Sequence, residues 1–265
     1  MPADVWDDAE RLERYVGRWS RLVAREFVAW LEVPPGGRWL DVGCGSGALT
    51  ETVLVVAEPA SVVGVDTSAA YVAYAGARVT DSRASFAVGD AQALDHPDAA
   101  FDAVASSLVL NFLPDPGRGV AEMARVVNPG GVVAGYVWDY AGEMQLMRRF
   151  WDAAVELDPA AADLDEGRRM AGCNPPALEA LFAGAGLVDV ETRGIDVPTV
   201  FAGFDDYWMP FEGGQGPAPG YCVSLPEERR EALRERLREM LPAEADGSIR
   251  LIARVWAVRG TAHER

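Results

Sequence analysis

The sequence is poor in the residues that bind metals and form disulfides. It contains two histidines, His96 and His263, and three cysteines, Cys44, Cys173 and Cys222, among 265 residues. The cysteines lack the short spacing of zinc ligands, and an odd number of widely separated thiols does not suit a disulfide framework. We therefore expect no bound metal, and free thiols of this kind are typical of a reducing compartment.

Basic residues and long apolar runs are also scarce. Lysine and arginine number 24 against 41 aspartates and glutamates, which gives a formal net charge of −17. Such a surface repels a phosphate backbone and acidic lipids, so neither nucleic acids nor membranes are expected as partners. No apolar run approaches the roughly 20 residues that span a bilayer, and no basic segment precedes a short apolar one near the N-terminus. The sequence therefore predicts a cytoplasmic protein with a small-molecule substrate.

The most informative motif is a glycine-rich stretch that follows a short apolar segment. Residues 38–42 are typical of a β-strand and contain Asp41, and Gly43, Gly45 and Gly47 follow at alternate positions. Glycine suits a backbone that bends sharply off a strand and lies close to a ligand, where a Cβ atom would collide. The same glycines, with the alanine after Gly47, also satisfy the looser pattern of dinucleotide-binding loops. Taken alone, this loop therefore fits either a nucleotide site or a tight turn.

Two further β-rich runs end in an acid. Residues 62–66 end in Asp66, and residues 86–90 end in Asp90. An acid at the tip of the second strand can accept hydrogen bonds from both hydroxyls of a ribose. Asp90 could accept from an adenine amine while the backbone amide of Ala91 faces the ring. The alternative is that each acid caps the helix after it, but acids at three successive strand ends favour a nucleoside-binding site.

The following segments continue a regular alternation of strands and helices. Residues 101–106 are typical of a fourth strand and residues 118–127 of a helix, and residues 128–131 (Asn-Pro-Gly-Gly) provide turn residues before a fifth strand at 132–138. This alternation predicts an α/β fold with a doubly wound sheet.

Together, these motifs resemble those of the class I S-adenosylmethionine-dependent methyltransferases, in particular the ubiquinone/menaquinone-methyltransferase-like group. The resemblance covers residues 38–138 and includes the Asp-x-Gly-x-Gly-x-Gly order, the acids at the next two strand ends and the Pro-Gly-Gly turn. It implies a Rossmann-like seven-stranded sheet whose last strand is antiparallel, and S-adenosyl-L-methionine as the cofactor. The cofactor-binding positions that it implies are Tyr15, Asp41, Gly43, Gly45, Asp66, Thr67, Asp90, Ala91 and Ser106.

The remaining sequence predicts additions to this core within a single methyltransferase domain over residues 1–265. The core is expected at residues 33–138, 174–200 and 248–260, with an N-terminal helix at 10–32 and cap insertions at 139–173 and 201–247. The cap is expected over the carboxyl ends of the strands, where open α/β sheets bind ligands. Within the second insertion, residues 224–241 predict one helix that begins with a capping box formed by Ser224 and Glu227.

The N-terminal helix is expected to carry one residue of the cofactor site. Apolar side chains recur at helical spacing from Tyr15 to Leu31, which predicts a helix with one buried face. Similar methyltransferases place a tyrosine of this segment over the methionine end of the cofactor, which implies this role for Tyr15. Arg18 could reach the cofactor carboxylate or form a surface ion pair.

Candidate catalytic residues follow from what methyl transfer requires. The sulfonium already activates the methyl group, so positioning supplies most of the rate, and a base is needed only if the acceptor must lose a proton. The resembled family often has a His-His-Leu-Pro type run after the fourth strand, but residues 110–114 read Leu-Asn-Phe-Leu-Pro and contain no base. Asn111 could orient an acceptor, and His96 is interpreted as a surface residue.

The end of the fifth strand supplies the other candidates. Asp139 could accept a proton or cap the next helix, and Tyr140 is the second catalytic candidate. Trp138, Trp208 and Phe211 are expected to bind a partly aromatic or apolar substrate. The sequence thus predicts a small-molecule methyltransferase. An NAD-linked oxidoreductase and a catalytically inactive S-adenosylmethionine-binding module are the alternatives.

Overall fold

The computed structural model describes residues 17–214 and 216–263, which fall into two compact units. The core unit contains Ser20–Val137, Gly172–Ile195 and the described residues from Val255 onward. The helical unit contains the described residues up to Trp19, together with Trp138–Ala171 and Asp196–Arg254. The division of one domain into a core and two cap insertions stays a prediction.

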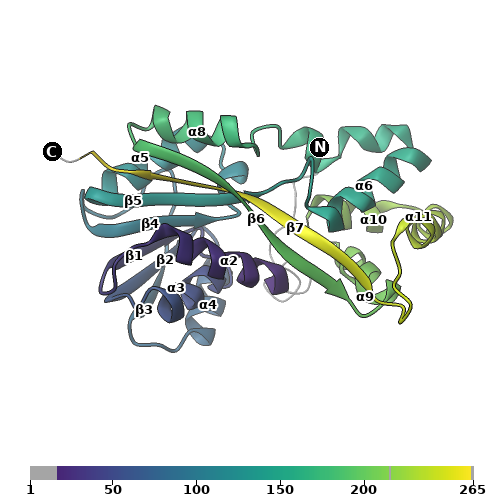
Figure 1. Cartoon of the computed structure of the whole chain (residues 1–265), viewed down its shortest axis with the longest axis horizontal. Coiled ribbons are helices and arrows are strands. Elements are labelled where there is room, and N and C mark those ends of the chain that lie inside the picture. The colour runs from purple at the N-terminus through teal and green to yellow at the C-terminus, as the bar shows by residue number, and fades with distance from the viewer. Residues whose placement is uncertain (1–16, 215, 264–265) are drawn as a thin grey trace. The chain divides into compact units, whose positions relative to one another are not determined.

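The elements alternate as the sequence indicates (Figure 1). In chain order they are α2 (Arg18–Leu31), β1 (Arg38–Val42), α3 (Ala48–Val56), β2 (Ser61–Asp66), α4 (Ala69–Arg78), β3 (Ala84–Val88), β4 (Phe101–Ser107), η2 (Leu110–Phe112), α5 (Pro116–Val126), β5 (Val127–Trp138), α6 (Gln145–Leu157), η3 (Pro159–Asp163), α7 (Glu166–Arg169), α8 (Pro175–Gly184), β6 (Val188–Phe201), α9 (Phe204–Trp208), η4 (Met209–Gly213), α10 (Pro217–Ser224), α11 (Glu227–Met240) and β7 (Ile249–Thr261).

The strands form one mixed sheet in the order β3-β2-β1-β4-β5-β7-β6. The first five strands are parallel neighbours. β7 runs antiparallel to β5, because the Gly130 amide donates to the Ala262 carbonyl and the Ala262 amide donates to the Gly131 carbonyl, both at 2.9 Å. This topology confirms the predicted doubly wound, Rossmann-like sheet of seven strands with an antiparallel last strand.

Burial along the strands follows their positions in the sheet. In the central strand β1 every residue after Arg38 is buried, as expected for a parallel strand covered on both faces. The edge strand β3 contains no buried residue. At the other edge, the second half of β6 alternates buried and exposed positions. The carboxyl ends of the central strands are therefore held by a rigid apolar sheet, and the loops that follow them start from fixed positions.

Helix α2 buries one face in the core unit, as its apolar spacing predicts. Val23, Phe27 and Leu31 lie four residues apart and are all buried. The Phe27 ring contacts Tyr136 of β5 edge-on, with 4.8 Å between the ring centroids. Residues 10–16 of the predicted helix lie outside the described residues.

The helical unit is organised around the buried face of α6. Phe150 of α6 stacks on Phe211, with ring centroids 4.4 Å apart. The next residue, Trp151, donates from its indole Nε1 to the buried Glu166 carboxylate at 2.8 Å. These contacts give the unit an aromatic core.

The prediction of one helix over residues 224–241 is wrong. Helix α10 ends at Ser224 and α11 begins at Glu227, with Pro226 at the N-cap position. Proline disfavours a helical conformation in the residue before it, and Leu225 is extended. The capping box does not form, because the Ser224 hydroxyl donates to the Tyr221 carbonyl of the preceding helix instead.

The three cysteines are buried, and none forms a disulfide with another described residue. Cys44 lies in the glycine loop after β1, and burial raises the pKa of its thiol above the ordinary value. Cys173 belongs to the core unit and Cys222 to the helical unit, where burial raises the pKa of the Cys222 thiol to about 12. Across the described residues, no helix combines the length and apolar character needed to cross a membrane.

Candidate functional site

The glycine loop after β1 adopts backbone conformations that explain its composition. Gly43 has φ +75° and Gly45 has φ +49°, both in the left-handed region that glycine enters without strain. A Cβ atom on Gly43 would lie 2.4 Å from Cγ2 of Val109, so this glycine permits close packing against the loop after β4. A Cβ atom on Gly45 would meet nothing within 4 Å. The middle of the loop therefore faces open space.

Asp66, at the end of β2, holds this loop through its carboxylate. One oxygen accepts from the Gly45 amide at 3.0 Å, and the other accepts from the Ser68 amide at 2.9 Å. The N-cap of α4 is Ser68, whose hydroxyl accepts from the Tyr71 amide, so Asp66 is not the helix cap. An ionised carboxylate has about four acceptor positions, and two remain for hydroxyl donors.

Asp41 is a buried acid directly before the loop. Its Oδ2 accepts from the Thr50 hydroxyl at 2.7 Å, whereas Oδ1 is buried and accepts no hydrogen bond from the described residues. The pKa of Asp41 is raised to about 7, mainly by burial and in smaller part by the charge of Asp66, while the Thr50 hydrogen bonds oppose the rise. Buried polar atoms nearly always have a partner, so Oδ1 is an acceptor available to a ligand.

The end of β4 forms the next part of the site. The Ser106 hydroxyl donates to the Val42 carbonyl at 2.9 Å and so joins the carboxyl ends of β4 and β1. Leu108 follows with φ +60°, a conformation that costs a non-glycine residue free energy, and its amide donates to the Tyr136 carbonyl at 2.9 Å. Backbone strain of this kind concentrates at ligand-binding loops.

The loops after β3 and β4 contain the remaining candidates of the core unit. Asp90 is exposed, and its carboxylate accepts from the Gln92 amide at 2.8 Å, while Ala91 is buried. Thr67 is exposed in the turn after β2, and Asn111 lies half-buried in η2. The structure thus gathers the predicted residues of the core unit at the carboxyl ends of β1 to β4.

Two residues that the sequence analysis considered in relation to the site, His96 and Arg18, contact other residues of the protein. His96 is half-buried, and its ring packs edge-on against Phe101, with centroids 5.1 Å apart. The Arg18 guanidinium lies 3.1 Å from the Asp206 carboxylate, which is the ion-pair alternative considered for it. It also lies over the Trp19 and Phe201 rings. Tyr15 lies outside the described residues.

The candidates after β5 belong to the helical unit and are buried. The Asp139 carboxylate accepts from the Glu143 amide at 2.9 Å, and the Asp139 amide donates to the Arg254 carbonyl at 3.0 Å. The N-cap of α6 is Met144, so Asp139 closes the turn before the helix and does not cap it. Trp138 and Tyr140, on either side, are both buried. Their catalytic and substrate-binding roles stay predictions.

Trp208 and Phe211 belong to the aromatic core of the helical unit. The Trp208 indole donates to Glu212 at 3.0 Å and stacks on Phe204 at a centroid distance of 6.4 Å. Phe211 has no exposed surface. Their assignment to substrate binding stays a prediction.

Two residues of the site region were not singled out from the sequence. Thr50 has no motif of its own, and only its position one turn into α3 relates it to Asp41. Tyr136 is buried on β5 and hydrogen-bonded with Ser107, and burial raises the pKa of its hydroxyl. Within its strand, Tyr136 resembles any other core residue.

This arrangement defines an α/β fold of the methyltransferase type: a sheet of this strand order, a glycine loop after β1 and acids at the ends of β1 and β2. Residues 40–135 match the family model for a methyltransferase domain. Trans-aconitate 2-methyltransferase of Deinococcus radiodurans is 31% identical over 183 residues, which are 68% of this chain and 69% of that protein. The chain belongs to the class I S-adenosylmethionine-dependent methyltransferases.

Other relatives agree with this family. The 2-methyl-6-phytyl-1,4-hydroquinone methyltransferase of a Synechocystis strain is 33% identical over 187 residues, 69% of this chain but only 57% of that protein. The solved Haemonchus contortus phosphoethanolamine N-methyltransferase 2 in complex with S-adenosyl-L-methionine has a TM-score of 0.61 at 18% identity. The alignment covers 97% of this chain and 57% of that one. The YcgJ protein of Bacillus subtilis has a TM-score of 0.58 at 17% identity, over 94% of this chain and all of that one. These two solved structures have the same fold as this chain.

Proposed function

We propose that this chain transfers the methyl group of S-adenosyl-L-methionine to a small, partly aromatic or apolar metabolite. The observation that carries the proposal is the link between the glycine loop and Asp66, beside the open space at Gly45. That arrangement leaves acceptor positions on a carboxylate next to a backbone that a ligand can approach closely. Family membership makes S-adenosyl-L-methionine the ligand to expect there.

The residues of the core unit suit the parts of this cofactor. Asp66 would accept hydrogen bonds from the ribose hydroxyls, and Asp41 Oδ1 would accept one from the methionine amino group, for which it has no competing donor. Asp90 and Ala91 would hold the adenine. The other positions assigned to the cofactor on the same grounds are Tyr15, Gly43, Gly45, Thr67 and Ser106.

The cofactor supplies a methyl group that its sulfonium activates for displacement. The chain's own residues then have to orient the acceptor and exclude water, and a group that takes a proton is needed only for a hydroxyl or amine acceptor. Asn111 would orient the acceptor through its side-chain amide. Asp139 is the candidate to accept a proton, with Tyr140 beside it, and Trp138, Trp208 and Phe211 are the candidates to contact the substrate.

The substrate class follows from the relatives and the charge. The names of the curated relatives specify aconitate and a prenylated hydroquinone, both small molecules. A net charge of −17 disfavours nucleic-acid and membrane partners, and three widely spaced cysteines suit a reducing compartment such as the cytoplasm. An NAD-linked oxidoreductase is not favoured, because the curated relatives described above are methyltransferases.

Calorimetric titration of the purified chain with S-adenosylhomocysteine, and separately with NADH, tests the proposal. We expect roughly micromolar binding of S-adenosylhomocysteine and no binding of NADH. Binding of NADH alone would overturn the proposal. Release of S-adenosylhomocysteine from the methyl donor on a panel of quinols, phenols and carboxylic acids then distinguishes an active enzyme from an inactive binding module.

A further inference from the structure

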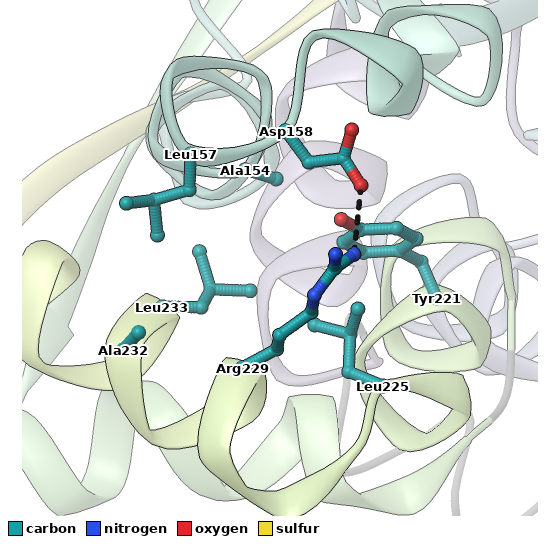
Figure 2. Close-up of a pocket in the computed structure, with 8 residues that line it drawn as sticks. All are labelled: Ala154, Leu157, Asp158, Tyr221, Leu225, Arg229, Ala232 and Leu233. Atoms are coloured by element: carbon teal, nitrogen blue, oxygen red, sulfur yellow. Dashed lines mark hydrogen bonds and ion pairs between the residues drawn. The ribbon is translucent and has the colours of Figure 1, made fainter.

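The helical unit contains a pocket of about 180 Å³ between α6, α10 and α11 (Figure 2). Every residue that lines it belongs to this one unit, so the pocket is a feature of the unit by itself. The lining residues are Ala154, Leu157, Asp158, Tyr221, Leu225, Arg229, Ala232 and Leu233.

The pocket is large enough for a ring because small or partly exposed side chains line much of it. Ala232 of α11 contributes only a methyl group, and Leu157 at the end of α6 is 48% exposed. An apolar cavity of about 150 Å³ holds a benzene molecule. The volume and the leucine walls therefore fit a ligand body of benzene size.

The Tyr221 ring, which forms one wall of the pocket, packs against two aromatic side chains of α6. Its ring lies against Trp151 and Phe150, with centroid distances of 5.5 and 6.3 Å. Two ion pairs connect the helices on either side: Asp158 with Arg229 at 3.3 Å, and Glu156 with Arg236 at 2.9 Å. The aromatic contacts of Tyr221 leave this wall of the pocket preformed for a ligand, which lowers the entropic cost of binding.

The polar end of the pocket offers donors more than acceptors. Both oxygens of Asp158 already accept hydrogen bonds, one from the Ala160 amide at 3.1 Å and one from Arg229. A guanidinium has five N–H donors, and that of Arg229 uses one of them on Asp158. Figure 2 shows the Arg229 guanidinium directed toward the Asp158 carboxylate at this end of the pocket. An anion with a planar pair of oxygens matches such a group.

The ion pair between Asp158 and Arg229 does not prevent Arg229 from binding a ligand carboxylate. The Arg229 side chain is 67% exposed, and an ion pair so open to water contributes little to stability. Its guanidinium can therefore turn toward a ligand carboxylate at small cost. A ligand amine would meet the positive charge of Arg229 and would compete with its guanidinium for Asp158, so a carboxylate is the favoured head group.

We propose that this pocket binds a small monocarboxylic acid with a benzene-sized apolar body, with the ring between the leucines and the carboxylate on Arg229. All residues that line this site belong to the helical unit. The proposal does not depend on methyl transfer.

Fluorine NMR of the full-length chain with 4-fluorobenzoate tests the proposal. We expect saturable broadening of the fluorine signal, with weaker binding of 4-fluorobenzyl alcohol and none of 4-fluorobenzylamine. Absence of saturable benzoate binding, or a preference for the amine, would overturn the proposal.

Three variants test whether benzoate binds in this pocket. Arg229→Met should weaken benzoate binding roughly fivefold, the effect of an exposed charge pair worth about 1 kcal/mol. Arg230→Met is the matched control, because Arg230 is the next residue of α11 and does not line the pocket, and it should bind as the parent does. Ala232→Trp should abolish binding by filling the space, at an exposed position that tolerates a larger side chain. Equal affinity in all three variants, with melting temperatures like the parent's, would show that benzoate binds elsewhere and would overturn the assignment.

Discussion

The Gly45 amide donates a hydrogen bond to Oδ2 of Asp66 over 3.0 Å, across 21 positions of sequence. Through it, the carboxylate that ends β2 fixes the conformation of the loop that follows β1. The same carboxylate has acceptor positions to spare. We therefore expect both the shape of the loop and ligand recognition to depend on this one side chain.

Replacing Asp66 with alanine should weaken S-adenosylhomocysteine binding by a factor of ten or more. A hydrogen bond to a charged group contributes about 1.5–3 kcal/mol, and this carboxylate would accept more than one. Calorimetric titration measures the loss. Asp81→Ala is the control, since Asp81 is a carboxylate of the core unit that pairs with Arg83 instead, at 2.7 Å. Equal affinity in both variants would remove Asp66 from the cofactor site.

Substitutions in the glycine loop should affect the stability of the protein and its binding of the cofactor to different extents. Gly43→Ala should cost about 3 kcal/mol of unfolding free energy, because it adds a collision with Val109 to an unfavourable backbone angle. Gly45→Ala should cost only about 1–2 kcal/mol but abolish cofactor binding, since the new methyl group fills the space meant for the ligand.

Gly36→Ala is the matched control for Gly45→Ala. Gly36 has φ +83° and also has nothing within 4 Å of an added Cβ, but it lies before β1. Urea unfolding should give the two variants similar losses of stability, and calorimetry should show normal binding only for Gly36→Ala. Normal binding by Gly45→Ala would contradict the assignment of the open space to a ligand.

Asp41 should make stability depend on pH in an unusual direction. Its pKa of about 7 in the folded chain lies above that of an unfolded aspartate, so between about pH 4 and pH 7 the folded state holds the extra proton. Its contribution to the free energy of unfolding should therefore fall as the pH rises through this range, by on the order of 3 kcal/mol.

The Asp41→Asn variant isolates this effect, because asparagine can still accept from Thr50 but does not titrate. Urea unfolding of both proteins at several pH values gives the difference in stability, which removes the contributions of other carboxyl groups. The parent should lose stability relative to the variant from pH 4 to pH 7. A constant difference would mean that Asp41 titrates normally.

The helical unit should depend on one ion pair of Arg148 and not on the other. Its guanidinium binds Asp165 through two hydrogen bonds, at 2.7 and 3.0 Å, and Asp152 through one at 2.9 Å. The Asp165 side chain is 6% exposed and that of Asp152 is 44% exposed. Urea unfolding should show a loss of about 3 kcal/mol for Asp165→Asn, but under about 0.5 kcal/mol for Asp152→Asn. Equal losses would mean that burial does not set the strength of these pairs.

The sequence predicted those features that a few neighbouring residues encode. Glycine is strongly favoured at a position such as Gly45, whose φ is positive, so a motif of alternate glycines indicates the loop directly. Acids at the ends of apolar runs likewise located Asp41 and Asp66. The seven-stranded sheet with an antiparallel last strand followed from the family resemblance, which rests on the same local motifs.

Features that depend on distant contacts could not be read in this way. Tyr136 meets Phe27 and Ser107 only after the sheet has formed. The pairing of Arg148 with Asp165 depends on how η3 and α7 fold back along α6. Pro226 was visible, but the regular charge pattern around it suggested a continuous helix, and the proline's restriction on Leu225 prevailed.

The buried cysteines provide built-in reporters of opening motions. A thiol reacts with a disulfide reagent only as an exposed thiolate, so Cys44 and Cys222 must be uncovered before they are labelled. Because the first belongs to the core unit and the second to the helical unit, the two labelling rates report on the two units independently. A cofactor analogue that slows labelling of Cys44 alone would show that it protects one unit without restraining the other.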